Sequence, residues 1–284
     1  MNAVTATAGM FRRIGSQFGG AVGLAIVLVV VASAVFAPLV ATHDPDALDV
    51  LNRFSGPTTQ HWLGTDHLGR DLFSRLVHGS SVAMAVALTS ISTALIAGTL
   101  LGILAASLPA RSERLILILF DVISSFPSLV LALAVVAVFG PSTALVVVIV
   151  AITLIPHFGR VARAQVLTVR NAPYIEAERL LGASSWRIIV SHILPNIAGP
   201  LMVLASIDIP VVITIEAGLS FIGLGVRPPL ASWGTLIYDG YAYLSDSKLP
   251  VVIASSALGI ATLGFTLFGE ALRDAVDPRL NTDR

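Results

Sequence analysis

Long apolar runs with few charges dominate the hydropathy pattern of this 284-residue chain. A hydrocarbon core about 30 Å thick needs roughly 20 apolar helical residues to cross it. Six segments reach this length: residues 20–40, 81–108, a third beginning near 115, a fourth ending near 158, then 197–222 and 249–269. The pattern therefore predicts an all-α polytopic membrane protein with six transmembrane helices.

Turn and kink residues divide these segments. The stretch 139–142, Phe-Gly-Pro-Ser, is the only turn chemistry between the third and fourth segments, so we expect a tight helical hairpin there. Proline lacks a backbone donor, and Pro127 and Pro210 should therefore kink or locally break the third and fifth segments. Gly98 and Gly102 form a G-x-x-x-G pattern in the second segment, which predicts close packing against another helix.

The composition agrees with a membrane protein, because 55% of the residues are hydrophobic, 12% are charged and the mean hydropathy is +0.88. The absence of cysteine excludes disulfides, thiolate metal sites and cysteine nucleophiles. Arg12 and Arg13 precede the first apolar segment as in a signal peptide. That segment is long enough to span, however, and we interpret it as a retained helix.

The distribution of Lys and Arg predicts the orientation, because positively charged loops stay in the cytoplasm. With the N-terminus inside, the inner segments hold twelve of the 17 basic residues: Arg12, Arg13, Arg111, Arg114, Arg160, Arg163, Arg170, Arg179, Arg187, Arg273, Arg279 and Arg284. Both termini are therefore expected in the cytoplasm, and residues 160–196 become the longest inner loop. In the outer loop, Asp71 and Arg75 stand at a spacing that favours an i, i+4 ion pair.

The inner loop has the pattern of two short helices joined by a turn. Pro173 favours a helix start, Gly182 a left-handed residue that ends this helix, Ser184 the cap of a second helix, and Pro195 its end. Any amphipathic loop at a membrane surface has the same shape. Shape alone therefore leaves a surface loop and a docking loop equally open.

The first of these short helices is amphipathic. At 100° per residue, Tyr174, Ala177 and Leu181 share one face, and Glu176 and Arg179 lie opposite. An apolar face on a charged loop needs a surface to cover it.

The loop resembles the E-A-A and glycine motif of the permease subunits of ABC importers. A Glu-Ala pair, a glycine and a later Leu-Pro stand at that family's spacing, at Glu176, Ala177, Gly182, Leu194 and Pro195. The resemblance implies that these residues form an ATPase-coupling loop, which docks into a cleft on a cytoplasmic ATPase subunit.

The resemblance extends along the chain and has two departures in the loop. Residues 61–80, 216–240 and 271–280 are similar to segments of the C-type permeases of dipeptide and oligopeptide importers. In the loop, Glu178 replaces the second alanine of the motif, and His192 replaces its isoleucine.

The resemblance implies a type I ABC importer permease fold in a bacterial inner membrane. Residues 1–80 would hold the N-terminal tail, first helix and extracytoplasmic segment, 81–270 a core of five helices, and 271–284 a cytoplasmic tail. The implied partners are a second homologous permease subunit, two ATPase subunits, an extracytoplasmic substrate-binding protein, a peptide substrate and lipid. No cofactor, metal or nucleic acid is implied.

The chain's own chemistry argues against catalysis. Its single lysine, Lys248, stands in no phosphate-binding loop, so ATP must be hydrolysed by another polypeptide. Asp208 and Glu216 lie two turns apart in the fifth segment, either on a translocation pathway or as structural acceptors. A permease for nickel or another small solute is an alternative, and a proton-coupled secondary transporter is the rival class.

Overall fold

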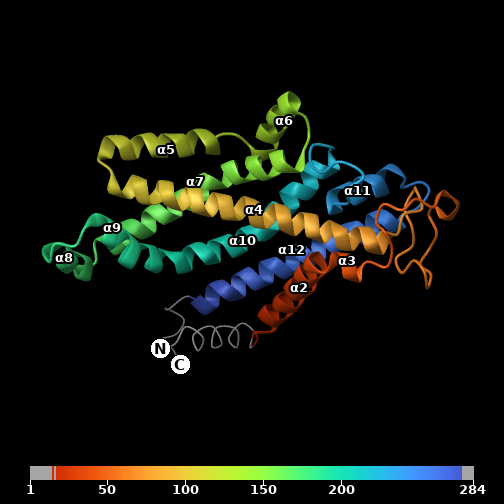
Figure 1. Ribbon diagram of the computed structural model, residues 1–284, viewed down its shortest axis with the longest axis horizontal. Coiled ribbons are helices and arrows are strands. Elements are labelled where there is room, and N and C mark those ends of the chain that lie inside the picture. The colour runs from red at the N-terminus through yellow and green to blue at the C-terminus, as the bar shows by residue number, and fades with distance from the viewer. Residues whose placement is uncertain (1–14, 16, 277–284) are drawn as a thin grey trace.

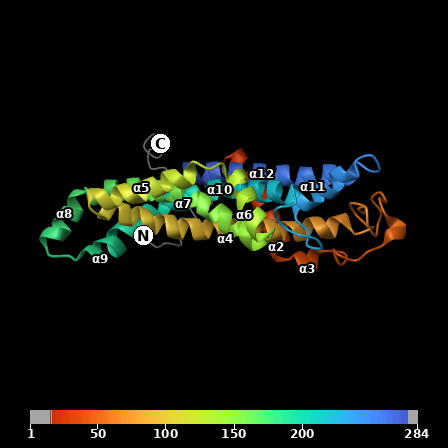
Figure 2. The same cartoon turned by 90° about the horizontal axis from the view of Figure 1, so that it is seen from above.

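The structure is a computed structural model that describes residues 15 and 17–276 as an elongated bundle of helices (Figures 1 and 2). Its α-helices are α2 (Phe18–Val35), α3 (Ala37–Val40), α4 (Leu72–Ser107), α5 (Ala110–Ser124), α6 (Ser128–Phe139), α7 (Thr143–Arg170), α8 (Pro173–Leu180), α9 (Ser185–Ile188), α10 (Leu194–Phe221), α11 (Trp233–Ala242) and α12 (Leu249–Val276). A 3₁₀ turn, η1 (Val50–Asn52), and a π-helix, η2 (Ile189–Ile193), complete the described elements.

Five helical stretches in the described part of the chain are long and apolar enough to cross a membrane: α2, α4, α7, α12 and the stretch Ser185–Phe221 that contains α10. Helices α5 and α6 reach that length only as a pair. This confirms the all-α membrane class, and the six predicted segments correspond to these five and the bent pair.

Proline has different effects in the third and fifth segments. The α5–α6 pair is bent by 82° at Pro127, because the residue before a proline avoids helical geometry. Helix α10 instead continues through Pro200 and Pro210, so of the expected kink or break at Pro210, the break does not occur. A membrane helix tolerates the backbone hydrogen bond that a proline lacks, because neighbouring helices and side chains satisfy the freed carbonyl group.

Several helices extend beyond the predicted segments. Helix α4 begins at Leu72 rather than at residue 81, and α7 continues to Arg170. The loop predicted at 160–196 is therefore shorter, because its first part belongs to α7. The predicted turn at 139–142 is confirmed: α6 ends at Phe139, Gly140 has a φ of 77°, and Ser142 caps α7.

Helices α4 and α7 pack backbone to backbone at three glycines. A Cβ on Gly98 would lie 2.8 Å from the carbonyl oxygen of Ile155, and one on Gly102 only 2.5 Å from that of Gly159. The ring of Phe120 from α5 fills the space beside Gly159. The close approach predicted from the G-x-x-x-G pattern is confirmed, and its partner is α7.

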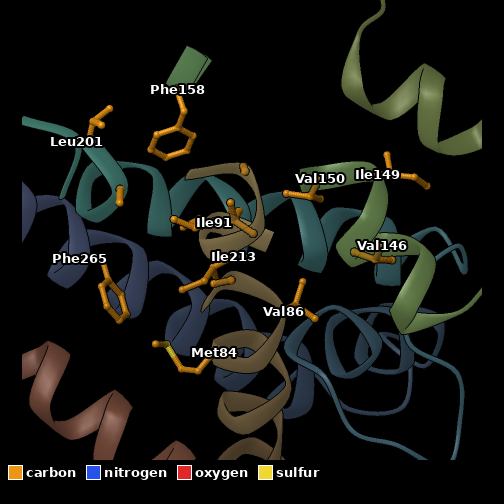
Figure 3. Close-up of a cluster of buried hydrophobic side chains, with 14 of the residues drawn as sticks. Met84, Val86, Ile91, Val146, Ile149, Val150, Phe158, Leu201, Ile213 and Phe265 are labelled. Atoms are coloured by element: carbon orange, nitrogen blue, oxygen red, sulfur yellow. The ribbon is translucent and has the colours of Figure 1, made fainter. Parts of the chain in front are cut away.

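The hydrophobic core surrounds this contact (Figure 3). The labelled side chains come from four helices: Met84, Val86 and Ile91 of α4, Val146, Ile149, Val150 and Phe158 of α7, Leu201 and Ile213 of α10, and Phe265 of α12. Helices α6, α8, α9 and α11 and the π-helix η2 contribute further side chains. Helix α2 packs on the other side of α12, where a Cβ on Gly23 would lie 2.6 Å from the backbone nitrogen of Phe268. The core thus sits between α4, α7, α10 and α12.

Buried charges fix the segment between α3 and α4 onto α4 and α11. Asp66 accepts a hydrogen bond from Arg70 Nε at 2.6 Å, and Arg70 Nη2 also reaches Asp239 of α11 at 3.2 Å. Arg75 pairs with Asp46 at 3.1 Å instead of with Asp71. The predicted ion pair between Asp71 and Arg75 is therefore wrong, because Arg75 points toward the segment between α3 and α4 that carries Asp46.

Asp71 has a different task, which is to cap α4. Its Oδ2 accepts hydrogen bonds from the backbone N–H and the hydroxyl of Ser74, and its Oδ1 lies 3.0 Å from His61 Nδ1. Burial raises the pKa of Asp71, but hydrogen bonds with Ser74, His61 and Thr42 outweigh this effect and hold the pKa below its usual value. The carboxylate therefore stays charged at the helix N-terminus, where the helix dipole also favours it.

We expect Gly102→Ala to destabilise the chain by about 1–3 kcal/mol, because the added methyl group overpacks the α4–α7 contact. Gly259→Ala is the matched control, since nothing lies within 4 Å of a Cβ at that exposed position of α12. Thermal unfolding of the two variants in detergent tests this expectation. Equal midpoints would contradict it.

Candidate functional site

Helices α8 and α9 form one end of the molecule, opposite α11 and the segment between α3 and α4 (Figure 1). We call residues 171–193 the α8–α9 loop. It begins where α7 ends at Arg170 and leads into α10. Both α7 and the stretch that contains α10 are long enough to cross a membrane, so the loop connects directly to two helices that extend through the bundle.

The turn between α8 and α9 has the hydrogen bonds of a Schellman motif. The N–H of Gly182 bonds to the carbonyl of Arg179, and the N–H of Ala183 to that of Glu178, both at 3.0 Å. Gly182 has a φ of 84°, which confirms the predicted left-handed residue. Ser184 then caps α9 by accepting a hydrogen bond from the N–H of Arg187 at 3.3 Å.

Three isoleucines hold the α8–α9 loop to the bundle. Ile175 of α8 is completely buried, and Ile188 and Ile193 are nearly so. Their side chains belong to the hydrophobic core. The loop is therefore anchored at both helices and is not a free surface segment.

The outer surface of the α8–α9 loop is apolar and exposed. Leu180 and Leu181 are each 84% exposed, Trp186 is 73% exposed and Tyr174 is 46% exposed. Exposed Glu176, Arg179 and Arg187 surround them. An apolar patch with a charged rim is typical of a protein interaction site. Leu180 and Trp186 add to the face that the sequence predicted.

Helix α9 continues into α10 through the π-helix η2, so Pro195 does not end it as predicted. The N–H of Leu194 bonds to the carbonyl of Ile189, five residues back, and Pro195 then lies in the first turn of α10. Because Pro195 has no backbone N–H, it donates no hydrogen bond to the preceding turn of this continuous helix. The side chain of Asn196 donates to the carbonyl of His192 at 2.6 Å, which satisfies this joint.

The two residues that depart from the importer motif lie together. Glu178 Oε1 of α8 is 3.7 Å from His192 Nε2 of η2, and both side chains are about one-third exposed. The ring centroid of Tyr174 lies 6.3 Å from that of the His192 imidazole. The pair links α8 to the start of the long helix that contains α10.

The two intramembrane carboxylates of α10 occupy different surroundings. Glu216 is completely buried, and its Oε1 accepts a hydrogen bond from Ser220 at 2.7 Å. Ser220 in turn accepts the N–H of Val226 at 3.0 Å. Asp208 lies nearer to a surface, and its Oδ2 is 3.7 Å from Nε2 of His157 in α7.

Sequence reasoning missed His157 as a partner of Asp208. The signal was available, since His157 is an ionisable residue within an apolar segment, as Asp208 is. Their pairing depends on how α7 and α10 rotate against each other, which the separate segments do not reveal. The His157 side chain is 49% exposed, so this pair reaches an open surface of the chain.

The fold and this site define a polytopic helical membrane protein that exposes an apolar surface on its α8–α9 loop. The family model described as "Binding-protein-dependent transport system inner membrane component" matches residues 98–282, and that of the "N-terminal TM domain of oligopeptide transport permease C" matches residues 8–57. The chain belongs to the family of binding-protein-dependent transport system inner membrane components.

Curated relatives match nearly the whole chain. The probable D,D-dipeptide transport system permease protein DdpC of Escherichia coli is 40% identical over 89% of this chain and 85% of its own length. The dipeptide transport system permease protein DppC of Alkalihalophilus pseudofirmus is 35% identical over 96% of this chain and 90% of its own length. The glutathione transport system permease protein GsiD of Pectobacterium atrosepticum is 38% identical, with coverages of 90% and 85%.

The fold is shared with a solved ABC transporter. A chain of the MetNI methionine ABC transporter, in an inward-facing conformation, superposes with a TM-score of 0.60 and 18% identity, over 72% of this chain and 98% of its own length. The predicted type I importer permease fold is thereby confirmed. The family favours an importer subunit over the rival secondary transporter.

We expect Glu178→Ala and His192→Ile to be coupled in a double-mutant cycle, with an interaction free energy of about 0.2–1 kcal/mol, as for partly exposed ion pairs. The rate of tryptic cleavage at Arg179 and Arg187 measures local opening of the α8–α9 loop. Glu176→Ala is the matched control, because no ion pair of Glu176 occurs within the described part of the chain. Additive effects of Glu178→Ala and His192→Ile on the cleavage rate would contradict an interaction between the two side chains.

Proposed function

We propose that this chain is the permease subunit of an ATP-binding-cassette importer and forms half of a translocation pathway for dipeptides or oligopeptides. The observation that carries this proposal is the α8–α9 loop, an anchored helical turn that exposes Leu180, Leu181 and Trp186 to a partner. The glycine of the family motif, Gly182, has the left-handed conformation that such a turn requires. The relatives described above, which are named as dipeptide or glutathione transport permeases, support the cargo class.

The α8–α9 loop couples the chain to ATP hydrolysis by docking into a cleft on a cytoplasmic ATPase subunit. The exposed apolar side chains enter that cleft, and the charged rim orients them. Closure of the two ATPase subunits then moves the loop. Because the loop is anchored by Ile175 and Ile188 and continues into α7 and α10, the movement reaches the membrane helices.

The remaining partners follow from the same family. A second homologous permease subunit supplies the other half of the pathway, and an extracytoplasmic binding protein delivers the substrate at the end formed by α11 and residues 41–71. The protein lies in the bacterial inner membrane with both termini in the cytoplasm. The basic residues Arg12, Arg13, Arg279 and Arg284, on which part of this orientation rests, lie outside the described residues.

Asp208 and Glu216 have separate roles in this proposal. Asp208 faces the pathway, because its pair with the half-exposed His157 lies at a surface of the chain. Glu216 supports the frame of the pathway, since it is completely buried and linked through Ser220 to the loop after α10.

Uptake by proteoliposomes tests the function. The complete complex, with both permeases, the ATPases and the binding protein, should accumulate a radiolabelled dipeptide in the presence of ATP. This chain alone should not. ATP-dependent accumulation of Ni²⁺ without dipeptide uptake would show that the cargo is a metal ion and not a peptide. Uptake by this chain alone under a proton gradient would overturn the assignment as an importer subunit.

Gly182→Val should lower uptake by the complex about five- to thirty-fold, because a left-handed conformation costs a β-branched residue roughly 1–2 kcal/mol or more. Nothing lies within 4 Å of a Cβ at Gly182, so the cost comes from the backbone alone. Gly259→Val, at an open position of α12, is the matched control. Normal uptake by the Gly182 variant, at equal complex abundance, would count against a docking role.

Cysteines introduced into this cysteine-free chain test the orientation. Ser185→Cys in α9 should react with an impermeant maleimide only from the cytoplasmic side, and Thr59→Cys only from the outside. Both residues are exposed, and the segments that carry them, α9 and the stretch between α3 and α4, lie at opposite ends of the bundle (Figure 1). Labelling of both from one side would refute the proposed topology.

A further inference from the structure

An open groove of about 540 Å³ runs between α7, α10 and α12. Val161 and Gln165 of α7, Pro200, Leu204 and Ile207 of α10, and Arg273 of α12 line it. Its volume lies in the range of small-molecule sites, which are mostly apolar with a few polar groups. We call it the α7–α10 groove.

His157 and Asp208 lie one helical turn beyond the residues that line the α7–α10 groove. His157 lies one turn before Val161 on the same face of α7, and Asp208 lies one turn after Leu204 on α10. Helices α7 and α10 run in opposite directions along the bundle (Figure 1). One turn back along α7 and one turn forward along α10 therefore both lead away from the α8–α9 loop and toward the middle of the bundle. The polar pair therefore adjoins the groove on the side away from the α8–α9 loop, and the half-exposed His157 side chain leaves it open to a surface of the chain.

The Asp208 carboxylate is short of hydrogen-bond donors. The residue is only 7% exposed, and its Oδ2 is buried and accepts no hydrogen bond from the described residues. The distance of 3.7 Å to His157 Nε2 exceeds that of a hydrogen bond. A buried carboxylate without donors is costly. A cationic donor that enters the groove would supply what the chain does not.

The opposite charge lies farther along the α7–α10 groove, on Arg273. Gly269 of α12 packs against Ile207, and Arg273 follows one turn later, about 6 Å closer to the α8–α9 end of the bundle. The axial separation of Asp208 and Arg273 is therefore about 7–8 Å, which is close to the length of a dipeptide at about 3.5 Å per residue. A negative group one turn beyond the lining residues and a positive group among them match a zwitterion.

We propose that Asp208 and His157 form a subsite for the protonated α-amino group of a transported dipeptide, with Arg273 near its carboxylate. This inference rests on the proposed function and gives it a substrate class, namely short peptides with a free amino terminus. An ammonium group has three donors and no acceptor, which suits a carboxylate with an imidazole beside it. The carboxylate positions the cargo and takes no part in ATP hydrolysis.

Equilibrium dialysis of the purified permease–ATPase complex without binding protein tests this subsite. The probes are radiolabelled dialanine and N-acetyl-dialanine. Wild type should bind dialanine on the order of tenfold more tightly, as expected for a hydrogen-bonded charge. Asp208→Asn should lose this preference and leave the affinity for N-acetyl-dialanine unchanged, whereas a purely structural role would weaken both.

Asp121→Asn is the matched control, since it makes the same change in an exposed carboxylate of α5 and should retain the preference. If the Asp208 variant does not assemble, His157→Gln gives the same test and should reduce the preference. A preference that survives in these variants, no preference in wild type, or no dialanine binding by a complex active in uptake would overturn the subsite. Failure of the proposed function is distinct, because it would appear as absent ATP-dependent uptake in wild type.

Discussion

The close approach of α4 and α7 is the constraint on which the rest of the structure depends. Lipid and core are equally apolar, so membrane helices gain their association from tight packing rather than from hydrophobic burial. Gly98, Gly102 and Gly159 allow the two backbones to meet. This contact sets the position of α7, and α7 in turn supports α5 through Phe120 and forms one wall of the α7–α10 groove.

Helix α7 connects the two proposed functional regions. At one end α7 leads into the α8–α9 loop, and near its middle it carries His157. The return path is also helical, because the π-helix η2 lets α9 continue into α10 past Pro195. π-Helices are frequent at functional sites. Movement of the loop can therefore shift α7 and α10 together and change the groove between them.

Polar groups within the apolar bundle have two outcomes that depend on packing. Glu216 finds a donor in Ser220 and is sealed beside α11, whose Gly234 packs on Ala217. Asp208, two turns away on the same helix, meets only the distant imidazole of His157. Each carboxylate keeps one buried oxygen that accepts no hydrogen bond from the described residues, Oε2 of Glu216 and Oδ2 of Asp208. Only Asp208 has a half-exposed partner beside it, so of the two it is the one suited to bind a ligand.

The sequence by itself determined the membrane class, the helical hairpin at 139–142, the bend at Pro127, the glycine contact of α4 and the left-handed turn at Gly182. These features depend on local chemistry: apolar length, proline geometry and glycine at a positive φ. Only the tertiary structure decided that α10 runs unbroken past Pro195 and Pro210, that Arg75 turns to Asp46, and that His157 faces Asp208. Those outcomes depend on how helices rotate against one another. An apolar pattern does not encode that rotation, because the lipid-facing and core-facing sides of a membrane helix have similar hydropathy.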